Sequence, residues 1–163
     1  MHWLELDSPI GRLLLVGDDA RLRAIHFQAG PHPARPSAAW IRSTTPFTTV
    51  VTQLQQYFAG SRREFDLPFL AEGTPFQCAI WQAILHIPYG TTIAYSELAR
   101  RVGRPGASRA AGAANGANPL PIVVPCHRVI GADGTLTGFG GGLDIKIRLL
   151  ALEGATCIRS PGK

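Results

Sequence analysis

The sequence predicts an α/β protein in two parts: a small N-terminal domain of strands and a helix, then a mostly helical domain. Three short apolar runs separated by turn residues open the chain, whereas apolar residues recur at helical spacing from residue 75 onward. The segment Ala71–Pro75 separates the two patterns. We therefore expect an N-terminal domain over residues 1–70, a linker over 71–75 and a second domain over 76–163.

Strands and one covering helix make up the expected N-terminal domain. The strands are placed at residues 3–6, 12–16 and 21–27, with hairpin chemistry in Gly17-Asp18-Asp19-Ala20. Thr45-Pro46 then opens a helix that Gly60 stops. No pattern of catalytic side chains occurs in this part, so we expect it to act as a scaffold.

The second domain begins with a helix that Thr74 caps, with Pro75 at its first position. Two shorter helices follow over residues 95–102 and 107–115, the first capped near Ser96, with a glycine-containing turn between them. This outline is typical of a helix-turn-helix, here winged-helix-like.

The second of these helices is unusual because it is nearly all Ala and Gly. Arg109 is its one long side chain. A major-groove reader carries several long polar side chains, whereas small residues suit close docking in a minor groove, with Arg109 projecting into the duplex. A buried Ala-rich core helix is the alternative.

Charge is unevenly distributed along the chain. Residues 1–75 carry seven basic and seven acidic side chains, while residues 76–163 carry nine and four, so the whole net charge of +5 lies in the second part. This imbalance is typical of a surface that meets a polyanion, and ordinary solubility charge is the alternative.

Three cysteines, Cys78, Cys126 and Cys157, lie far apart without a C-x-x-C pair. The pattern argues against a zinc site and a disulfide framework, and it favours free thiols in a reducing compartment. Neither a signal-peptide pattern nor an apolar run long enough for a bilayer is present. We expect a cytoplasmic protein that has no membrane partner, no metal and no cofactor.

The most specific segment runs from Pro119 to Ile130. Its Ile-Val-Val run indicates a buried, extended backbone, and Pro125 precedes Cys126, His127 and Arg128. A thiolate is a nucleophile, and a neighbouring His or Arg favours its formation. A buried structural cysteine is the alternative.

This segment resembles the O6-alkylguanine-DNA alkyltransferase family. The resemblance rests on Pro125-Cys126-His127-Arg128-Val129, on Asn118-Pro119 before it and on Gly140-Gly141-Gly142-Leu143 after it. Further landmarks are similar in order and spacing: Phe76-Gln77-x-x-Ile80-Trp81, Ile87-Pro88-Tyr89-Gly90 and Tyr95-x-x-Leu98-Ala99. It spans roughly residues 75–154, while the N-terminal third is similar only in size, position and its start, Asp7–Gly11.

The resemblance implies a catalytic role for five residues. Cys126 would accept the alkyl group, His127 would activate it through a water molecule, and Glu153 would orient His127. Asn118 would join the helix-turn-helix to the active-site segment, and Tyr95 would lie near the flipped base.

The resemblance also implies how DNA is held. A base inside a duplex cannot reach a thiolate, so the target nucleotide would have to be extruded. Arg109 would then take its place in the duplex. The other residues expected to contact DNA are Tyr95, Ser96, Ala107, Ser108, Ala110, Gly112 and Ala113. The alkylguanine pocket would comprise Val129, Phe139, Gly140 and Gly141, with the Gly140 N–H donating to the leaving oxygen and the Cys126 and Val129 carbonyls accepting from the guanine amino group.

Phe139 is one departure, because the family usually has tyrosine there. Phe keeps an apolar wall and lacks the hydroxyl donor, so we expect slower methyl transfer and easier entry of bulkier alkyl groups.

The implied function is direct reversal of DNA damage. The partner would be double-stranded DNA containing O6-alkylguanine, and O4-alkylthymine stays open as a substrate. A thioether has no leaving-group chemistry at neutral pH, so the protein would act once per molecule. We expect a monomer, with clustering on DNA left open. The rival functions are a non-catalytic lesion sensor, another helix-turn-helix DNA-binding protein and a Cys–His acyl hydrolase.

Overall fold

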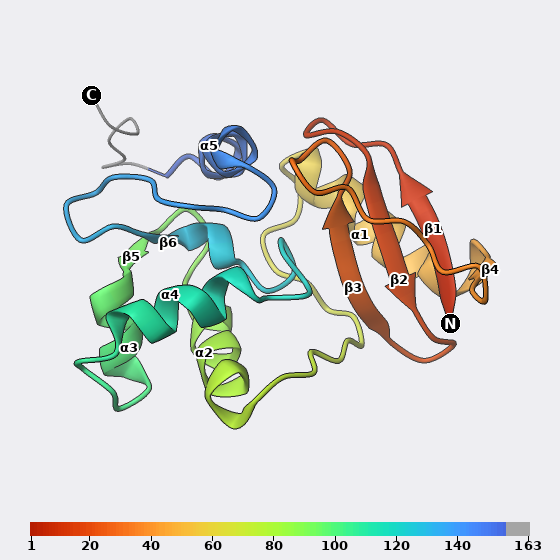
Figure 1. Cartoon of the computed structure of the whole chain (residues 1–163). Helices are drawn as coiled ribbons and strands as arrows, with labels where there is room; N and C mark the ends of the chain where they lie inside the picture. Colours follow the sequence, from red (N-terminus) through yellow and green to blue (C-terminus); the bar gives the residue numbers. More distant parts are fainter. Residues whose placement is uncertain (156–163) are drawn as a thin grey trace.

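A four-stranded sheet forms the centre of the N-terminal lobe (residues 1–70) in the computed structural model, which describes residues 1–155 (Figure 1). The strands are β1 (His2–Leu6), β2 (Leu13–Gly17), β3 (Leu22–Phe27) and β4 (Ile41–Arg42), in the order β3-β2-β1-β4. The first three pair antiparallel, and β4 lies parallel to β1. The three predicted strands are confirmed. The two-residue, exposed β4 was not predicted because it carries no apolar alternation.

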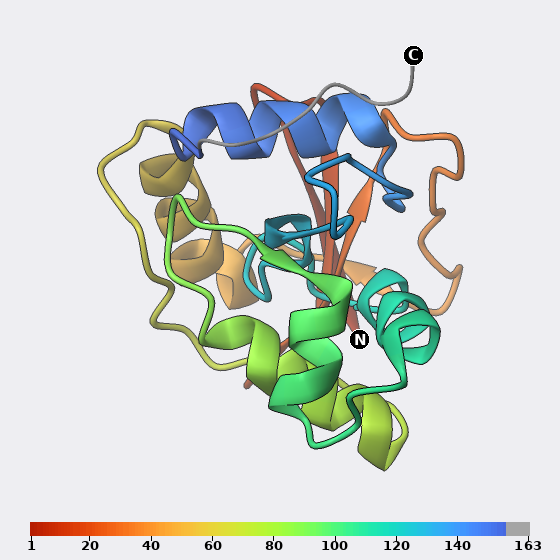
Figure 2. The same cartoon turned by 90° about the vertical axis from the view of Figure 1, so that its left-hand side faces the viewer.

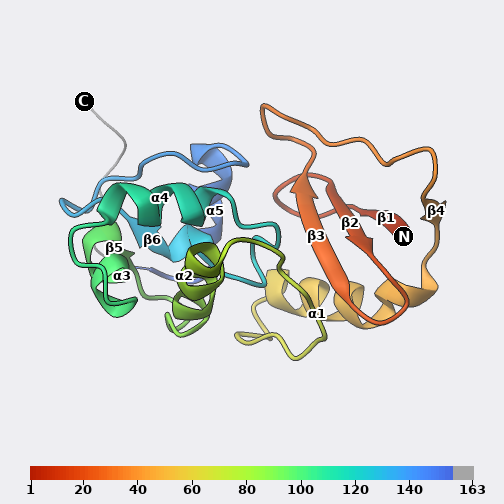
Figure 3. The same cartoon turned by 60° about the horizontal axis from the view of Figure 1, so that its bottom comes forward.

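One face of the sheet is covered by helix α1 (Thr48–Phe58), which follows a 3-10 turn, η1 (Thr45–Phe47) (Figure 3). Every residue of β2 is buried, and Val50, Leu54 and Tyr57 form the buried stripe of α1. The stripe recurs at intervals of three and four residues, which is the spacing of one helix face. The helix predicted after Thr45-Pro46 is confirmed.

The C-terminal lobe (residues 75–155) contains the remaining α-helices. They are α2 (Pro75–Leu85), α3 (Tyr95–Arg101), α4 (Ser108–Gly116) and α5 (Leu143–Leu152). A two-stranded parallel sheet, β5 (Ile93–Ala94) with β6 (Val129–Ile130), joins the start of α3 to the active-site segment.

The helix ends follow the expected chemistry at α2 and depart from it at α3. Thr74 accepts a hydrogen bond from the Gln77 N–H and Gln77 bonds back to Thr74, a complete capping box. The expected cap near Ser96 is wrong, since the N-cap of α3 is Ala94, which has no side-chain cap. The strand β5 leads directly into α3, so its hydrogen bonds to β6 fix the entry of the chain.

Helix α4 presents one small-residue face inward and another outward. Ala111 and Ala114 are buried, whereas Arg109, Ala110 and Ala113 are exposed. The alternative of a fully buried core helix therefore does not hold, and α4 keeps an outer face of small residues with one long cation, Arg109.

The two lobes share a hydrophobic core. The Ile25 N–H of β3 donates to the Pro119 carbonyl at 2.9 Å, and Arg148 of α5 donates to the Pro9 carbonyl at 3.2 Å. The last turn of α5 lies next to α1 (Figure 2). Whether 1–70 and 76–163 fold as separate domains stays a prediction, and Cys157 lies outside the described residues. No helix within residues 1–155 is long and apolar enough to span a membrane.

Candidate active site

The buried segment before Cys126 is a tight turn, so the expected extended backbone over Ile122–Val124 is wrong. The Val124 N–H donates to the Leu120 carbonyl at 2.8 Å, and Ile122 has φ 75°. A β-branched residue in the left-handed region is strained, and such strain persists only where neighbouring contacts enforce it.

Asn118 supplies that enforcement. Its Oδ1 accepts from the Leu120 N–H at 3.0 Å, and its Nδ2 donates to the Val124 carbonyl at 2.8 Å, so one side chain bridges both ends of the turn. The linking role expected for Asn118 is consistent with this geometry.

Cys126 leaves this turn on a second, smaller one. Pro125, at φ −80° and ψ 65°, makes an inverse γ-turn in which the Cys126 N–H donates to the Val124 carbonyl at 2.8 Å. The 3-10 turn η2 (Cys126–Arg128) follows. The turn at Pro125 before Cys126 and the 3-10 turn that begins at Cys126 thus fix the backbone that carries the thiol.

The Cys126 thiol is only 4% exposed. Burial raises its pKa above the usual value, while an Asn118 hydrogen bond, the Lys146 charge and the N–H groups of Cys126 and His127 act in the opposite direction without reversing it. A thiol with a raised pKa is protonated at neutral pH, so its reaction as a nucleophile requires a base.

His127, the next residue along the chain, is the candidate for that base. Its fully buried Nε2 lies 2.8 Å from Glu153 Oε1. Burial lowers the pKa of His127 despite the opposing Glu153 charge, so the ring is neutral at pH 7. A neutral ring that donates from Nε2–H to a carboxylate has its lone pair on Nδ1. Within the described residues, Nδ1 has no hydrogen-bond partner.

The Glu153 carboxylate, at the C-cap of α5, is fully buried and accepts five hydrogen bonds. The donors to Oε1 are Tyr57 Oη (2.7 Å), His127 Nε2 (2.8 Å) and Arg128 Nη2 (2.9 Å), and the donors to Oε2 are Arg128 Nε (2.9 Å) and the Gly90 N–H (3.3 Å). Burial alone would raise the pKa of Glu153, but the hydrogen bonds from His127 and Arg128 outweigh it and hold that pKa well below its usual value.

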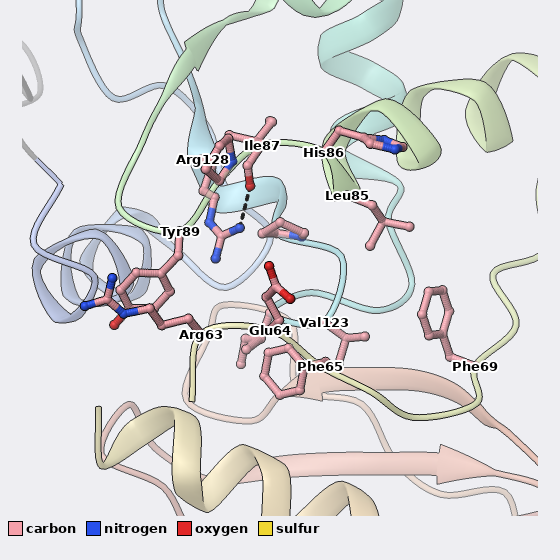
Figure 4. A pocket seen from close by; sticks show the side chains of 13 residues that line it. Arg63, Glu64, Phe65, Phe69, Leu85, His86, Ile87, Tyr89, Val123 and Arg128 are labelled. Carbon is pink, nitrogen blue, oxygen red and sulfur yellow. Dashed lines mark hydrogen bonds between the residues drawn. The ribbon is translucent and has the colours of Figure 1, made fainter. Parts of the chain in front are cut away.

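A cavity of about 460 Å³ lies behind this group of charges (Figure 4). Arg128 forms part of its wall and donates from Nη1 to the Ile87 carbonyl at 2.7 Å. The Tyr89 ring faces Arg128 and Arg63, whose guanidinium carbons lie 5.7 Å and 5.1 Å from the ring centroid. Cys126 does not line this cavity.

Cys126 instead lines a smaller pocket of about 150 Å³ between the lobes. Asn118, Phe139 and Gly140, all predicted site residues, line it as well. Gly138, from the same glycine-rich loop as Gly140, lines the pocket too. The lining residues that were not predicted are Ile25, His26, Phe27, His32, Asn115, Gly116 and Pro121. Four of these, Ile25 to His32, belong to the N-terminal lobe, which therefore supplies a wall of the pocket in addition to the scaffold role expected of it.

Phe139 is held by an N-terminal partner. Its ring centroid lies 5.6 Å from that of Phe27. A Cβ on Gly141 would lie 2.6 Å from the Phe27 ring, so glycine is required where the loop passes under this ring.

A second hollow lies beside the pocket and shares Gly138 with it. Its lining residues are Tyr95, Ser108, Arg109, Gly112, Thr137 and Gly138. The Thr137 hydroxyl donates to Tyr95 Oη at 3.3 Å, and burial raises the pKa of Tyr95, so its hydroxyl is protonated at neutral pH. Tyr95 therefore stands between the α4 surface and the loop over Cys126.

Sequence reasoning missed Lys146, a buried cation in the apolar stripe of α5. Its Nζ donates to the Val129 carbonyl at 2.7 Å and to the Thr137 carbonyl at 3.3 Å. Burial lowers its pKa to about 8. A lysine at a core position of an amphipathic helix was the available signal.

The remaining predicted residues are placed as follows. Ser96, Arg109, Ala110 and Ala113 are exposed, and Tyr95, Ala107, Ser108 and Gly112 are half-buried. Val129 and Gly141 are buried and do not line the pocket. The Cys126 carbonyl already accepts from the Val129 N–H and from Asn115 Nδ2, whereas among the described residues the Val129 carbonyl accepts from Lys146. The roles of these residues toward guanine stay predictions.

Comparison with known proteins gives one consistent family. Residues 75–155 match the family model "6-O-methylguanine DNA methyltransferase, DNA binding domain", and residues 1–71 match its "ribonuclease-like domain". A methylated-DNA–protein-cysteine methyltransferase of Methanosarcina acetivorans is 46% identical over 155 residues, which is 95% of this chain and 99% of that protein. The Mycolicibacterium paratuberculosis protein of the same name is 50% identical over 154 residues, covering 94% and 92%. A crystal structure of Mycobacterium tuberculosis OGT in complex with DNA superposes with a TM-score of 0.88 at 44% identity, covering 99% and 96%.

Glu153→Gln should destabilise the protein by about 3–5 kcal/mol, because it leaves the buried Arg128 cation without its counter-charge. Urea denaturation at pH 7 measures this, with Asp144→Asn, an exposed acid on the same helix, as the control expected to change little. A loss no larger than that of the control would contradict the assignment of Glu153 as the central counter-ion.

The same experiment at lower pH has a defined sign. The folded-state pKa of His127 lies below 6.5 and that of Glu153 below 4.5, so in both cases the unfolded chain takes up the proton first as pH falls. Wild-type stability should therefore fall below about pH 6.5 and fall more steeply below about pH 4.5. The steeper part should be reduced in Glu153→Gln.

Proposed function

The chain belongs to the 6-O-methylguanine DNA methyltransferase family, and we propose on this premise that it repairs DNA by moving the alkyl group of O6-alkylguanine onto its own Cys126. The observation that carries the proposal is the placement of Cys126. A protonated thiol lines a small pocket, and the adjacent His127 keeps an unpartnered Nδ1 on a ring oriented by Glu153.

The reaction is a single in-line displacement. The thiol proton passes through a water molecule to His127 Nδ1, and the sulfur attacks the alkyl carbon. A carbon–sulfur bond forms as the carbon–O6 bond breaks, and its electron pair leaves on guanine, which takes up one proton. The net products are a Cys126 thioether and unmodified guanine. Glu153 stabilises the transient imidazolium without being protonated itself.

The site requires the base to leave the duplex. Cys126 is nearly inaccessible, so a guanine stacked in DNA cannot reach it. The hollow that contains Arg109 and Tyr95 adjoins the pocket through Gly138, which gives an extruded nucleotide a short path from the α4 surface to the thiol. The exposed Ala110 and Ala113 suit close approach of α4 to the minor groove.

The reaction ends with the protein alkylated, because a thioether is stable at neutral pH. Each molecule would therefore act once. The protein would act on chromosomal DNA in the cytoplasm, as a monomer toward each lesion. A non-catalytic lesion sensor is not favoured, because a sensor has no use for the relay of His127 and Glu153 behind Cys126.

Incubation with a duplex that carries one O6-methylguanine should add the mass of one methyl group to the protein. Peptide mass spectrometry should locate that group on Cys126, and Cys126→Ser should stay unmodified. Cys78→Ser, which changes the half-buried thiol of α2, should react like wild type. Tight binding without a mass change would favour a lesion sensor and contradict the proposal.

Phe139→Tyr should transfer methyl groups faster than wild type, by at least about threefold in single-turnover measurements, because it adds a hydroxyl donor toward the leaving oxygen. It should also lower the rate for benzyl relative to methyl. Phe76→Tyr, which adds a phenol outside the pocket, is the control. Equal methyl-transfer rates for Phe139→Tyr and wild type would show that Gly140 and the rest of the pocket suffice without this donor.

A further inference from the structure

Tyr57 brings the N-terminal lobe into contact with the catalytic relay. It lies in the last turn of α1, far from the active-site motif in sequence, and its hydroxyl donates to Glu153 Oε1 at 2.7 Å. Among the hydrogen bonds of residues 1–155, this is the one that links a side chain of the N-terminal lobe to the relay of His127 and Glu153. Tyr57 does not line the pocket that contains Cys126.

The position of the Tyr57 hydroxyl is fixed by its ring. The side chain is fully buried, with ring centroids 5.4 Å from Phe58, 5.5 Å from Phe65 and 6.3 Å from Tyr89. Burial and the nearby Glu153 charge raise the pKa of Tyr57, so the hydroxyl is protonated and can donate at neutral pH. The aromatic cluster can be kept while the hydroxyl is removed, which separates packing from hydrogen bonding.

The oxygen that Tyr57 contacts is the one that holds His127. Oε1 accepts from Tyr57, from His127 Nε2 and from Arg128 Nη2, within 2.7–2.9 Å. Each additional donor stabilises the negative charge locally and leaves less of it for the His127 proton. The strength with which Glu153 favours a protonated His127 therefore depends on how many donors share Oε1.

We propose that Tyr57 is a positioning residue for the alkyl-transfer reaction, which orients Glu153 and moderates its pull on His127 through their shared Oε1. The proposal rests on the proposed function and extends it to a residue of the N-terminal lobe. It makes the basicity of His127 a property of both lobes.

Within residues 1–155, two cations act on this relay. Arg128 lies against Glu153 from η2, and Lys146 acts on Cys126 and His127 from α5. The neutral Gly90 N–H approaches Glu153 Oε2 from the loop after α2. Tyr89 covers Arg128, with Arg63 on its ring. Removal of the Tyr57 hydroxyl leaves all of these charges in place.

The test is the pH dependence of single-turnover methyl transfer by Tyr57→Phe. On the acid side of this profile the rate falls as the essential base becomes protonated, so the midpoint of this acid limb reports the pKa of that base. Without the Tyr57 hydroxyl, Glu153 stabilises the imidazolium more strongly, so the limb should move to higher pH by about half a unit. The plateau rate should fall roughly two- to tenfold, because one hydrogen bond that orients the carboxylate is lost.

Two further proteins separate this effect from a general loss of stability. Tyr89→Phe removes a hydroxyl that donates to the Leu152 carbonyl of α5 at 3.3 Å, next to the relay but outside it, and should leave the limb in place. A 3-fluorotyrosine at position 57 keeps the ring and is a stronger donor, so it should move the limb to lower pH. If Tyr57→Phe fails to fold, the shift of the acid limb in the fluorotyrosine protein still tests the proposal.

Opposite shifts for Tyr57→Phe and the fluorotyrosine protein, with none for Tyr89→Phe, support the proposal. A folded Tyr57→Phe whose acid limb coincides with that of wild type would overturn it, as would a fluorotyrosine protein with an unshifted limb. These outcomes presuppose methyl transfer by wild type, so failure of wild type to react would contradict the proposed function instead.

Discussion

The buried carboxylate of Glu153 is the point on which the other features of the site depend. A charge at zero exposure is tolerable only if its hydrogen-bonding capacity is filled, and the five donors to Glu153 come from three separate segments of the chain, none of them its own helix. Satisfying that charge therefore brings α1, the loop after α2, η2 and α5 together. The orientation of the His127 ring, and with it the nitrogen that is left without a partner, follows from this requirement.

The same constraint explains why the N-terminal lobe takes part in the site. Tyr57 reaches Glu153 from one side of the lobe, and Phe27 supports Phe139 over the pocket from another. The thiol is thus enclosed between the lobes. Enclosure keeps Cys126 protonated and protected until a substrate enters, at the cost of requiring a base. In the proposed reaction His127 and Glu153 supply that base, with a water molecule that carries the proton from the thiol to the ring.

The sequence predicted the features that depend on residues adjacent along the chain. It did not predict the residues that join the site only through tertiary packing. The motif around Cys126 and His127, the first three strands, the helices and the likeness of residues 75–154 to a known family could all be recognised. Tyr57 could not, because it sits in an ordinary apolar stripe and gains a role only when α5 packs against α1. His26 of β3 was missed because only the packing of the two lobes brings β3 to the pocket that contains Cys126. The strained turn at Ile122 was invisible, since local preference for a β-branched residue favours an extended backbone, and Asn118 overrides that preference with two hydrogen bonds.

The central claim is that Glu153 holds neutral His127 with its proton on Nε2, so that Nδ1 is the base for Cys126. Nitrogen-15 NMR of histidine-labelled protein at pH 7, with His127 assigned by comparison with His127→Asn, reads the two ring nitrogens separately. The account predicts a protonated Nε2 and an unprotonated Nδ1 in the unreacted protein. A proton on Nδ1, or on both nitrogens, would contradict it.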